Sequence, residues 1–195
     1  MTENAINIAV AQTLDDLMKV MVIRGAVFVG EQHHRYNLEF GEGELTRTHL
    51  LAQEGNEPIG TMRILKENKD AKFERLAILA SHRGKNVSEK IIEKGYEICR
   101  ESGIEQVCLF CKPHLLGFWE KQGYKKVGGN KALKVENMLL LPIVLNLRPD
   151  LGEKEAGYYD KIPDILLKEK GEWVEYQPDA LAIILNKKKE YLSGK

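Results

Sequence analysis

A polar turn at residues 83–88, "RGKNVS", has the residue types and spacing of an anion-binding loop. It follows the short apolar run "RLAIL" and leads directly into a segment with helical periodicity. The first backbone N–H groups of a helix have no partner within the helix, so they can bind phosphate oxygens. Arg83 and Lys85 add positive charge. The turn is therefore a candidate diphosphate site, and the alternative is an ordinary strand-to-helix turn with solvated basic side chains.

Asn86 and Ser88 occupy two positions where a phosphate loop usually has glycine. Glycine is favoured there because such a turn often adopts positive φ and because side chains obstruct the phosphate. Asparagine is the residue other than glycine that most readily adopts the left-handed conformation. Serine is small, and its hydroxyl can donate a hydrogen bond or cap the helix. Because the proposed donors are backbone amides, both residues are compatible with a working loop.

The elements that position this turn alternate between strands and helices. Residues 33–47, "HHRYNLEFGEGELTR", are polar and contain glycine, which predicts a loop. We expect strands in the following segments: "NAINIAV", "THLLAQEG", "PIGTMRILKE", "KFERLAIL", "IEQVCLFC" and "KVENMLLLPIVL". The alternation and the central strand–helix–strand crossover predict an α/β fold with a mixed sheet.

Helices are expected between these strands. Thr13 and Asp16 have the spacing of a capping box, and an apolar helical stripe follows it: Leu14, Leu17, Met18, Met21 and Val22. A second helix, 87–102, ends before Gly103 and has the following apolar face: Ile91, Ile92, Gly95, Ile98 and Cys99. A short third helix lies in "HLLGFWEKQ" and closes at Gly123.

The character of the chain changes after Leu147, which divides it into a domain at 1–147 and an extension at 148–195. The sequence of the extension predicts two helices, near 160–170 and 178–192, separated by a turn near Gly171. An apolar stripe in the second helix requires a partner: Leu181, Ile184 and Leu185. We expect the extension to pack on the domain, with a homodimer contact or a lid over a substrate cleft as alternatives.

The composition limits the possible partners. The 29 basic and 29 acidic residues give a net charge of zero, which argues against bulk electrostatic capture of nucleic acid or of an anionic membrane. No apolar run approaches the ~20 residues of a membrane helix, and the first residues lack the pattern of a secretory signal. Three cysteines are too few, and odd in number, for a disulfide framework. We therefore expect a soluble cytoplasmic protein.

A metal site is not expected. Cys108 and Cys111 lie at odd and even positions of one strand and so point to opposite faces, which is poor geometry for joint chelation. We expect them to be small buried residues. His33 and His34 fall in a polar loop, where histidines are more often solvated than ligating.

Three stretches, in this order along the chain, resemble the GNAT acyl-CoA-dependent N-acetyltransferases. "IRGAVFVGEQ", followed by "THLLA" and "PIGTMRILK", resembles the ElaA-like branch, which has Arg-x-x-Val-Phe-x-x-Glu-Gln. "RLAILASHRGKNVSEKIIEKGYE" resembles motif A, Arg/Gln-x-x-Gly-x-Gly/Ala, with Arg83, Asn86 and Ser88 at its key positions. "KPHLLGFWEKQGYKKVG" is similar to the short helix with Phe-Tyr-x-x-x-Gly-Phe. The resemblance covers roughly residues 5–145 and leaves the tail without a counterpart.

The resemblance implies a splayed mixed sheet that binds acetyl-CoA, or another acyl-CoA, between the strands at 73–79 and 104–111. The amides of Leu76 and Ile78 would pair with the pantetheine arm, and those of 83–88 would face the pyrophosphate. The implied cofactor-binding residues are Leu76, Ala77, Ile78, Arg83, Gly84, Lys85, Asn86, Val87, Ser88, Phe118 and Trp119.

The implied chemistry is attack of a neutral amine on a thioester. Amine pKa values near ~8 to ~10.4 require a base or a water-linked proton path. Glu74 is the first candidate base, and its alternative is a solvent-facing strand residue beside Arg75. Glu31 could transfer a proton or order a substrate loop. His114 could relay a proton, or only make a hydrogen bond at a helix start.

Trp119 departs from the family pattern, because the family tyrosine at this position is often the general acid for the departing thiolate. An indole N–H cannot fill that role. A general acid typically contributes ~10²–10⁴-fold, but a thiolate with a cysteine-like pKa of ~8.5 is a tolerable leaving group. Catalysis is therefore expected to be weakened rather than abolished. Tyr124, which replaces a family phenylalanine, is expected to point into the core.

Three functions remain open from the sequence. The first is an N-acyltransferase acting on an amine of a small molecule or peptide. The second is a non-catalytic acyl-CoA-binding or interaction protein, which Trp119 favours and which the retained Glu74 and Glu31 oppose. The third is a nucleotide-phosphate binder that shares only the loop.

Overall fold

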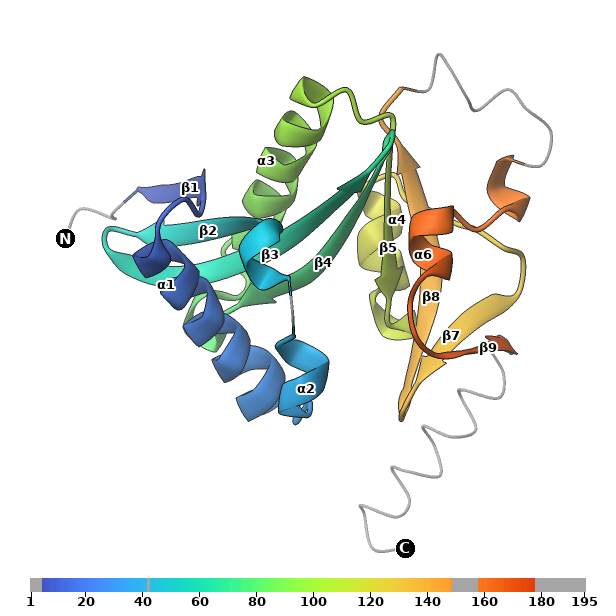
Figure 1. Ribbon diagram of the computed structural model, residues 1–195, viewed down its shortest axis with the longest axis horizontal. Coiled ribbons are helices and arrows are strands. Elements are labelled where there is room, and N and C mark those ends of the chain that lie inside the picture. Colours follow the sequence, from blue (N-terminus) through green and yellow to red (C-terminus); the bar gives the residue numbers. More distant parts are fainter. Residues whose placement is uncertain (1–4, 42, 149–157, 178–195) are drawn as a thin grey trace, which may run out of the picture. The chain divides into compact units, whose positions relative to one another are not determined.

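The computed structural model describes residues 5–41, 43–148 and 158–177. The chain forms two compact units (Figure 1). Of the described residues, the first unit contains 5–41, 43–109 and 145–148, and the second contains 110–144 and 158–177.

The first unit is built on a mixed sheet with the strand order β1-β2-β3-β4-β5. Neighbours from β1 to β4 are antiparallel, and β4 pairs with β5 in parallel. Each strand lies in a segment that the sequence predicts as a strand, so these five predictions are confirmed. The bounds are β1 (Ile6–Val10), β2 (Thr48–Glu54), β3 (Glu57–Glu67), β4 (Asp70–Ile78) and β5 (Gln106–Cys111), which enters the second unit at Phe110.

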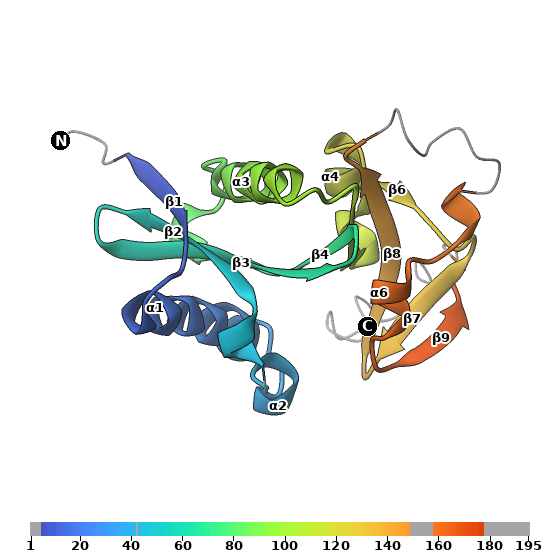
Figure 2. The ribbon, with the colours of Figure 1, turned by 45° about the horizontal axis from the view of Figure 1, so that its top comes forward.

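Helices cover both faces of this sheet. Figure 2 shows α3 (Val87–Glu101) on one face and α1 (Leu14–Arg24) on the other. The capping box of α1 is confirmed, because Thr13 Oγ1 accepts the N–H of Asp16 and the Asp16 carboxylate accepts the N–H of Thr13. The predicted apolar face of α3 is confirmed too, and Gly103 follows the helix with φ +71°. The buried residues of α3 are Val87, Ile91, Ile92, Gly95 and Cys99.

The apolar stripe of α1 is not the side of the helix that is most buried. The helix buries Val20 and Ile23, whereas Leu14, Met18 and Val22 are exposed. Apolar side chains lie on two sides of this helix, so periodicity alone does not select the side that meets the sheet. At its C-terminus, α1 continues into η1, a π-helical segment over Gly25–Glu31.

The segment 33–47, predicted as a loop, contains α2 (Tyr36–Glu39) and the 3₁₀ turn η2 (Glu44–Thr46). It also buries the carboxylate of Glu39. The polar composition of the segment did not reveal this burial, because its acidic groups pair with arginines from elements far away in sequence.

The second unit is built on the β7–β8 hairpin, to which β6 and β9 add. The segment "KVENMLLLPIVL", predicted as the last strand, contains the turn of this hairpin, where Glu136 adopts φ +50°. The predicted short helix before Gly123 is confirmed as α4. The bounds are α4 (Leu116–Lys121), β6 (Lys125–Lys126), β7 (Lys131–Val135), β8 (Met138–Asn146), α6 (Asp164–Leu167) and β9 (Glu172–Glu175).

Residues 158–177 of the extension pack within this second unit. The helix expected near 160–170 is shorter, since α6 spans Asp164–Leu167, and β9 then pairs antiparallel with β7. Ile165 and Leu166 of α6 are buried. The second predicted helix, 178–192, lies outside the described residues. None of the helices described is long and apolar enough to cross a membrane.

Candidate functional site

A bulge interrupts β4 in the strand region that the sequence assigns to the site. Ala77 pairs with Thr61 and Glu74 pairs with Arg63, so Arg75 and Leu76 together oppose Met62 alone. Arg75 adopts φ +56°, a left-handed conformation that is uncommon and strained for a long side chain such as arginine. A bulge bends a strand and increases its twist. The backbone of β4 therefore changes direction between Glu74 and Ala77.

The pairing of β4 with β5 precedes this bulge. The parallel register joins Asp70–Lys72 to Gln106–Cys108, while β4 itself continues to Ile78. The two strands thus pair only at their starts, and β4 bends after the paired residues. This arrangement agrees with the splayed sheet that the resemblance implies. Leu76, Ala77 and Ile78 lie on the bent part of β4.

The turn after β4 has the conformation expected of an anion loop. Gly84 adopts φ +75° and Asn86 adopts φ +56°, so asparagine does occupy the left-handed region here. The first bonded amide of α3 is that of Lys90, which donates to the Asn86 carbonyl at 3.2 Å. The backbone N–H groups of 84–88 have no hydrogen-bond acceptor among the residues that the structure places.

Space at the turn also fits an anion. A Cβ atom added at Gly84 would meet nothing within 4 Å. Val87 is buried and anchors the start of α3 in the core. The Ser88 hydroxyl donates to Glu89 at 2.8 Å rather than capping the helix. Free amides, an open approach and a fifteen-residue helix behind them fit a diphosphate group.

Glu31, at the end of η1, contacts this turn. Its carboxylate lies 2.5 Å from Arg83 Nη2, and Arg83 Nε donates to the Ile78 carbonyl at 3.0 Å. Two residues that the sequence singles out separately are thus brought together, although 52 positions separate them. The two contacts fix the side chain of Arg83, the residue that precedes the free amides.

Glu74 is not the solvent-facing residue of the alternative interpretation. Its side chain is 9% exposed and accepts from Arg63 Nε at 2.7 Å, and its second oxygen lies 3.0 Å from Lys72 Nζ. Burial tends to raise the pKa of Glu74, but Lys72 and Arg63 together hold the pKa below its ordinary value. The carboxylate is therefore ionised at neutral pH.

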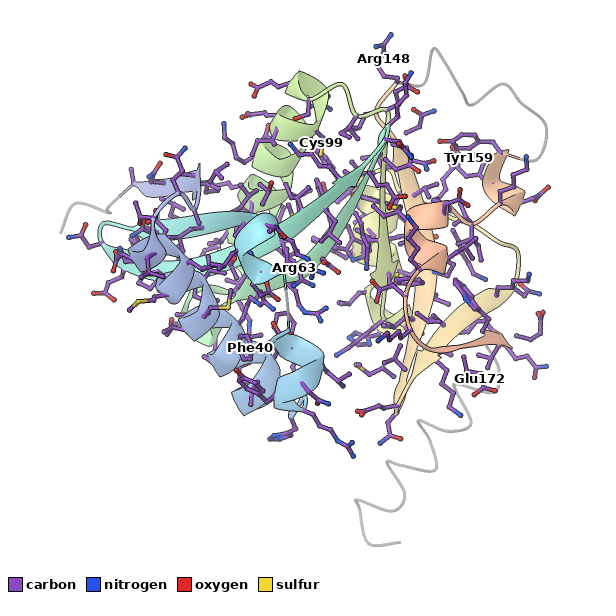
Figure 3. All side chains as sticks on the ribbon, viewed as in Figure 1. Phe40, Arg63, Cys99, Arg148, Tyr159 and Glu172 are labelled. Atoms are coloured by element: carbon purple, nitrogen blue, oxygen red, sulfur yellow. The ribbon has the colours of Figure 1, made fainter. Side chains whose placement is uncertain are left out.

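Glu74 belongs to a buried chain of ion pairs that the sequence did not reveal. Glu44 joins two arginines, at 2.5 Å from Arg63 Nη1 and 2.7 Å from Arg24 Nη1. Burial opposes the charge on Glu44, but the hydrogen bonds from Arg24 and Arg63 lower its pKa to about 2. Arg63, labelled in Figure 3, thus connects Glu44 with Glu74.

Glu39 extends this chain. Its carboxylate lies 2.5 Å from Arg24 Nε and 2.8 Å from Arg75 Nε. Burial raises the pKa of Glu39, against the opposing effect of Arg75 and Arg24. Arg75, the bulged residue of β4, also donates to the Leu38 carbonyl at 2.7 Å. The sequence signal for these buried ion pairs is a charged residue inside an apolar strand pattern, such as Arg63 in "GTMRILKE".

The remaining predicted site residues lie in the second unit. His114 is exposed in a 3₁₀ turn, and Trp119 is buried in α4. The Trp119 ring packs edge-on against Phe118 and Tyr124, each at 5.1 Å between ring centroids. Tyr124 is buried, which confirms that it points into the core.

All three cysteines are buried free thiols, as expected for Cys108 and Cys111. Burial raises the pKa of Cys99 to about 11 and that of Cys111 to about 12, so both thiols are protonated at neutral pH. Across 5–41, 43–148 and 158–177, no cluster of three His, Cys, Asp or Glu side chains could hold a metal ion.

Sequence comparisons identify the family. A family model described as "Acetyltransferase (GNAT) domain" matches residues 14–146. A Bacillus subtilis (strain 168) protein, whose name provisionally designates it an acetyltransferase, is 35% identical over 113 residues, which are 56% of this chain and 77% of that protein. The uncharacterized N-acetyltransferase YjcF of the same organism is 27% identical over 124 residues, 64% of this chain and 89% of YjcF.

Solved structures share the fold. Escherichia coli ElaA superposes with a TM-score of 0.62 at 22% identity, over 72% of this chain and 99% of ElaA. The PaiA N-acetyltransferase of Thermoplasma acidophilum, solved with coenzyme A, has a TM-score of 0.54 at 15% identity, over 71% and 98% of the two chains. The α/β fold and the GNAT resemblance are thereby confirmed. Because the family model matches more than half of its length, this chain belongs to the GNAT acetyltransferases, enzymes that transfer an acyl group from acyl-CoA.

Proposed function

We propose that this enzyme transfers an acetyl or other acyl group to an amine of a small molecule or peptide, by direct attack in a ternary complex. The observation that carries the proposal is the row of unpaired amides at 84–88, with Asn86 in the left-handed conformation. Side chains contribute little to such a loop, so the absence of the family glycines at Asn86 and Ser88 is compatible with binding. The dipole of α3 adds roughly 0.3–1 kcal/mol of attraction for an anion.

The proposed cofactor site continues from the loop onto β4. The residues of the loop, Arg83 to Ser88, would hold the diphosphate, and the backbone of Leu76, Ala77 and Ile78 would hold the pantetheine arm. Phe118 and Trp119, in the second unit, are further cofactor contacts that the family resemblance implies. When bound, the acyl-CoA supplies an activated thioester carbonyl.

Glu74 is the proposed catalytic carboxylate. Both of its oxygens are already paired, to Arg63 and Lys72, and its pKa is lowered. A carboxylate in this state attracts and orients an ammonium group, but it is a weak proton acceptor. We therefore assign it the orientation of the amine and of the water that carries the proton away. Glu31 would order the loop through Arg83, and His114 is a further candidate for the relay.

A non-catalytic acyl-CoA-binding protein is the second candidate function. The buried Trp119 favours it, because an indole cannot protonate a departing thiolate. The two functions differ in a thiol-release assay with acetyl-CoA over a panel of amines. Stabilisation by coenzyme A without turnover on any amine would select the binding protein.

The decisive experiment is a calorimetric titration with coenzyme A. Gly84→Val forces a β-branched residue into positive φ inside the loop and should weaken binding at least about tenfold. Gly103→Val is the matched control, because Gly103 also has positive φ and open space but lies at the other end of α3. Equal affinities of the two variants would refute the loop assignment, and no binding by the folded wild type would refute the acyl-CoA site.

The compartment is part of the same proposal. The buried free thiols Cys99, Cys108 and Cys111 suit a reducing environment, so we infer that the enzyme works in the cytoplasm.

A further inference from the structure

Helix α1 has a second apolar face that points away from the sheet. Leu14, Met18 and Val22 are 71%, 56% and 66% exposed, whereas Val20 and Ile23 on the other side are fully buried. Figure 2 shows the sheet on one side of α1 only. With the half-buried Leu17, they form what we term the outer face of α1: Leu14, Leu17, Met18 and Val22. Met21, at the edge of this face, is half-buried and packs against the core.

This face differs from ordinary scattered exposure. Single apolar side chains are common on protein surfaces, but contiguous apolar patches mark interaction sites. Leu14, Met18 and Val22 are spaced by four residues, so they form one continuous stripe along the helix. A helix that is apolar on both sides is typical of a buried environment. The outer face of α1 therefore requires a partner.

The charges beside the stripe have a defined arrangement. Asp15 and Lys19 lie along one edge of the outer face and form an ion pair at 2.8 Å. Along the opposite edge lie Leu17 and Met21, which are apolar. A partner must therefore offer an apolar strip with a complementary pair of charges on one side.

We propose that the partner is a second copy of the chain, joined by antiparallel packing of the two α1 helices about a two-fold axis at Met18. In this arrangement Met18 meets Met18 of the second copy, and Leu14 lies opposite its Val22. A two-fold axis brings the same edges of the two helices together. Asp15 of one copy then lies within about 3 Å, along the helix axis, of Lys19 of the other. The face is thus complementary to itself in both shape and charge.

The overall charge and size of the molecule agree with this partner. The chain has zero net charge, so two copies approach without long-range repulsion. A standard protein–protein interface buries about 800 Å² of surface on each partner. The eleven-residue helix α1 can supply only the central part of such an interface. We therefore expect a dissociation constant on the order of micromolar.

Sedimentation velocity over about 1–100 μM protein tests the proposal. The wild-type mass should rise with concentration from 22.2 kDa toward twice that value. Met18→Glu places two like charges at the two-fold axis and should weaken association at least about tenfold. Leu167→Glu introduces the same charge at an exposed leucine of α6 and should dimerise as the wild type does. Far-UV circular dichroism confirms folding, and Leu14→Glu replaces Met18→Glu if that variant is unfolded.

A charge swap tests the register. Lys19→Asp and Asp15→Lys each bring like charges together across the axis and should each weaken the dimer, while the double variant should recover most of the loss. A monomeric wild type at the highest concentration would overturn the proposal and assign the face to another occupant. A dimer that survives Met18→Glu would overturn it too, by locating the interface elsewhere. Neither measurement depends on acyl transfer.

Discussion

Asn86 shows why one residue can replace glycine in a phosphate loop. Its φ of +56° is the conformation that glycine would supply, and its side chain does not cap α3. Asparagine adopts this conformation more readily than other residues with a Cβ atom. The donors of the loop are backbone amides, which are the same for every residue except proline. The loop geometry is therefore retained without the family glycine.

Glu74 is the residue whose replacement separates chemistry from cofactor binding. Glu74→Gln should lower kcat about 10²-fold, the order expected when the reacting groups lose their orientation, with an unchanged dissociation constant for coenzyme A. It should also cost about 2–4 kcal/mol of stability, because Arg63 and Lys72 lose a buried anion. Steady-state kinetics, calorimetry and urea unfolding measure the three quantities.

The control for Glu74→Gln is Glu105→Gln. Glu105 also pairs with a lysine, Lys69, but on the surface, so the change should leave kcat unaltered. A normal kcat in a folded Glu74→Gln variant would remove Glu74 from the mechanism.

At the scale of elements, buried ion pairs connect α1, α2, η2, β3 and β4. Arg24 of α1 reaches Glu39 of α2 and Glu44 of η2, and Glu44 reaches Arg63 of β3. Each carboxylate offsets the cost of burying its arginine. These ion pairs therefore link α2 and η2 to the helix and strands of the sheet.

The stability of this arrangement should depend on pH through Glu44. Its pKa is about 2 in the folded protein, against an ordinary value of 4.5. The ionised carboxylate therefore stabilises the fold fully above pH 4.5, and this contribution is lost as the pH falls toward 2. When the pH is lowered from about 6 to about 3, the free energy of unfolding should fall by about 2 kcal/mol more in the wild type than in the Glu44→Gln variant.

Urea unfolding at both pH values measures this difference. Equal pH dependence in the two proteins would show that Glu44 is not the group that titrates, and Glu105→Gln, a surface acid, serves as the reference variant.

The contact of α3 with the sheet depends on a glycine. A Cβ at Gly95 would lie 2.6 Å from Met62 Cε and 2.7 Å from Phe73 Cζ. Gly95→Ala should therefore destabilise the protein by about 1–2 kcal/mol, since overpacking exceeds the gain in helix propensity. A Cβ at Gly117, in α4, would meet nothing within 4 Å. Gly117→Ala should therefore stabilise the protein by about 0.5–1 kcal/mol. Thermal unfolding of both variants should show shifts of opposite sign, and shifts of the same sign would contradict the packing argument.

At the scale of the whole molecule, the proposed cofactor loop and the β7–β9 ladder belong to different units. Coenzyme A should slow hydrogen exchange at 84–88, because the diphosphate accepts amides that have no acceptor in the free protein. Exchange at 131–135 and 172–175, where β7 pairs with β9, should not change. Hydrogen-exchange mass spectrometry with and without coenzyme A measures both. Protection only in the β7–β9 ladder would contradict the proposed site.

Sequence patterns predicted the elements with strong local signals. The capping box at Thr13, the apolar face of α3 and the strands of the first unit depend on residues close together in the chain. The β9 strand was missed because "EWVE" becomes a strand only through its pairing with β7. The sequence predicted a single strand where the structure has the β7–β8 hairpin. The turn was missed because glutamate, which occupies it at Glu136, is uncommon at positive φ.

By itself, the sequence determined the family, the α/β class and the loop at 83–88, because these depend on short motifs and on local backbone preferences. Only the tertiary structure decided which side of α1 is buried, and it alone paired Glu44 with Arg24 and Arg63 and brought Glu31 to Arg83. Those outcomes depend on contacts between residues 19 to 52 positions apart, and no periodicity in the chain specifies which distant charges will meet.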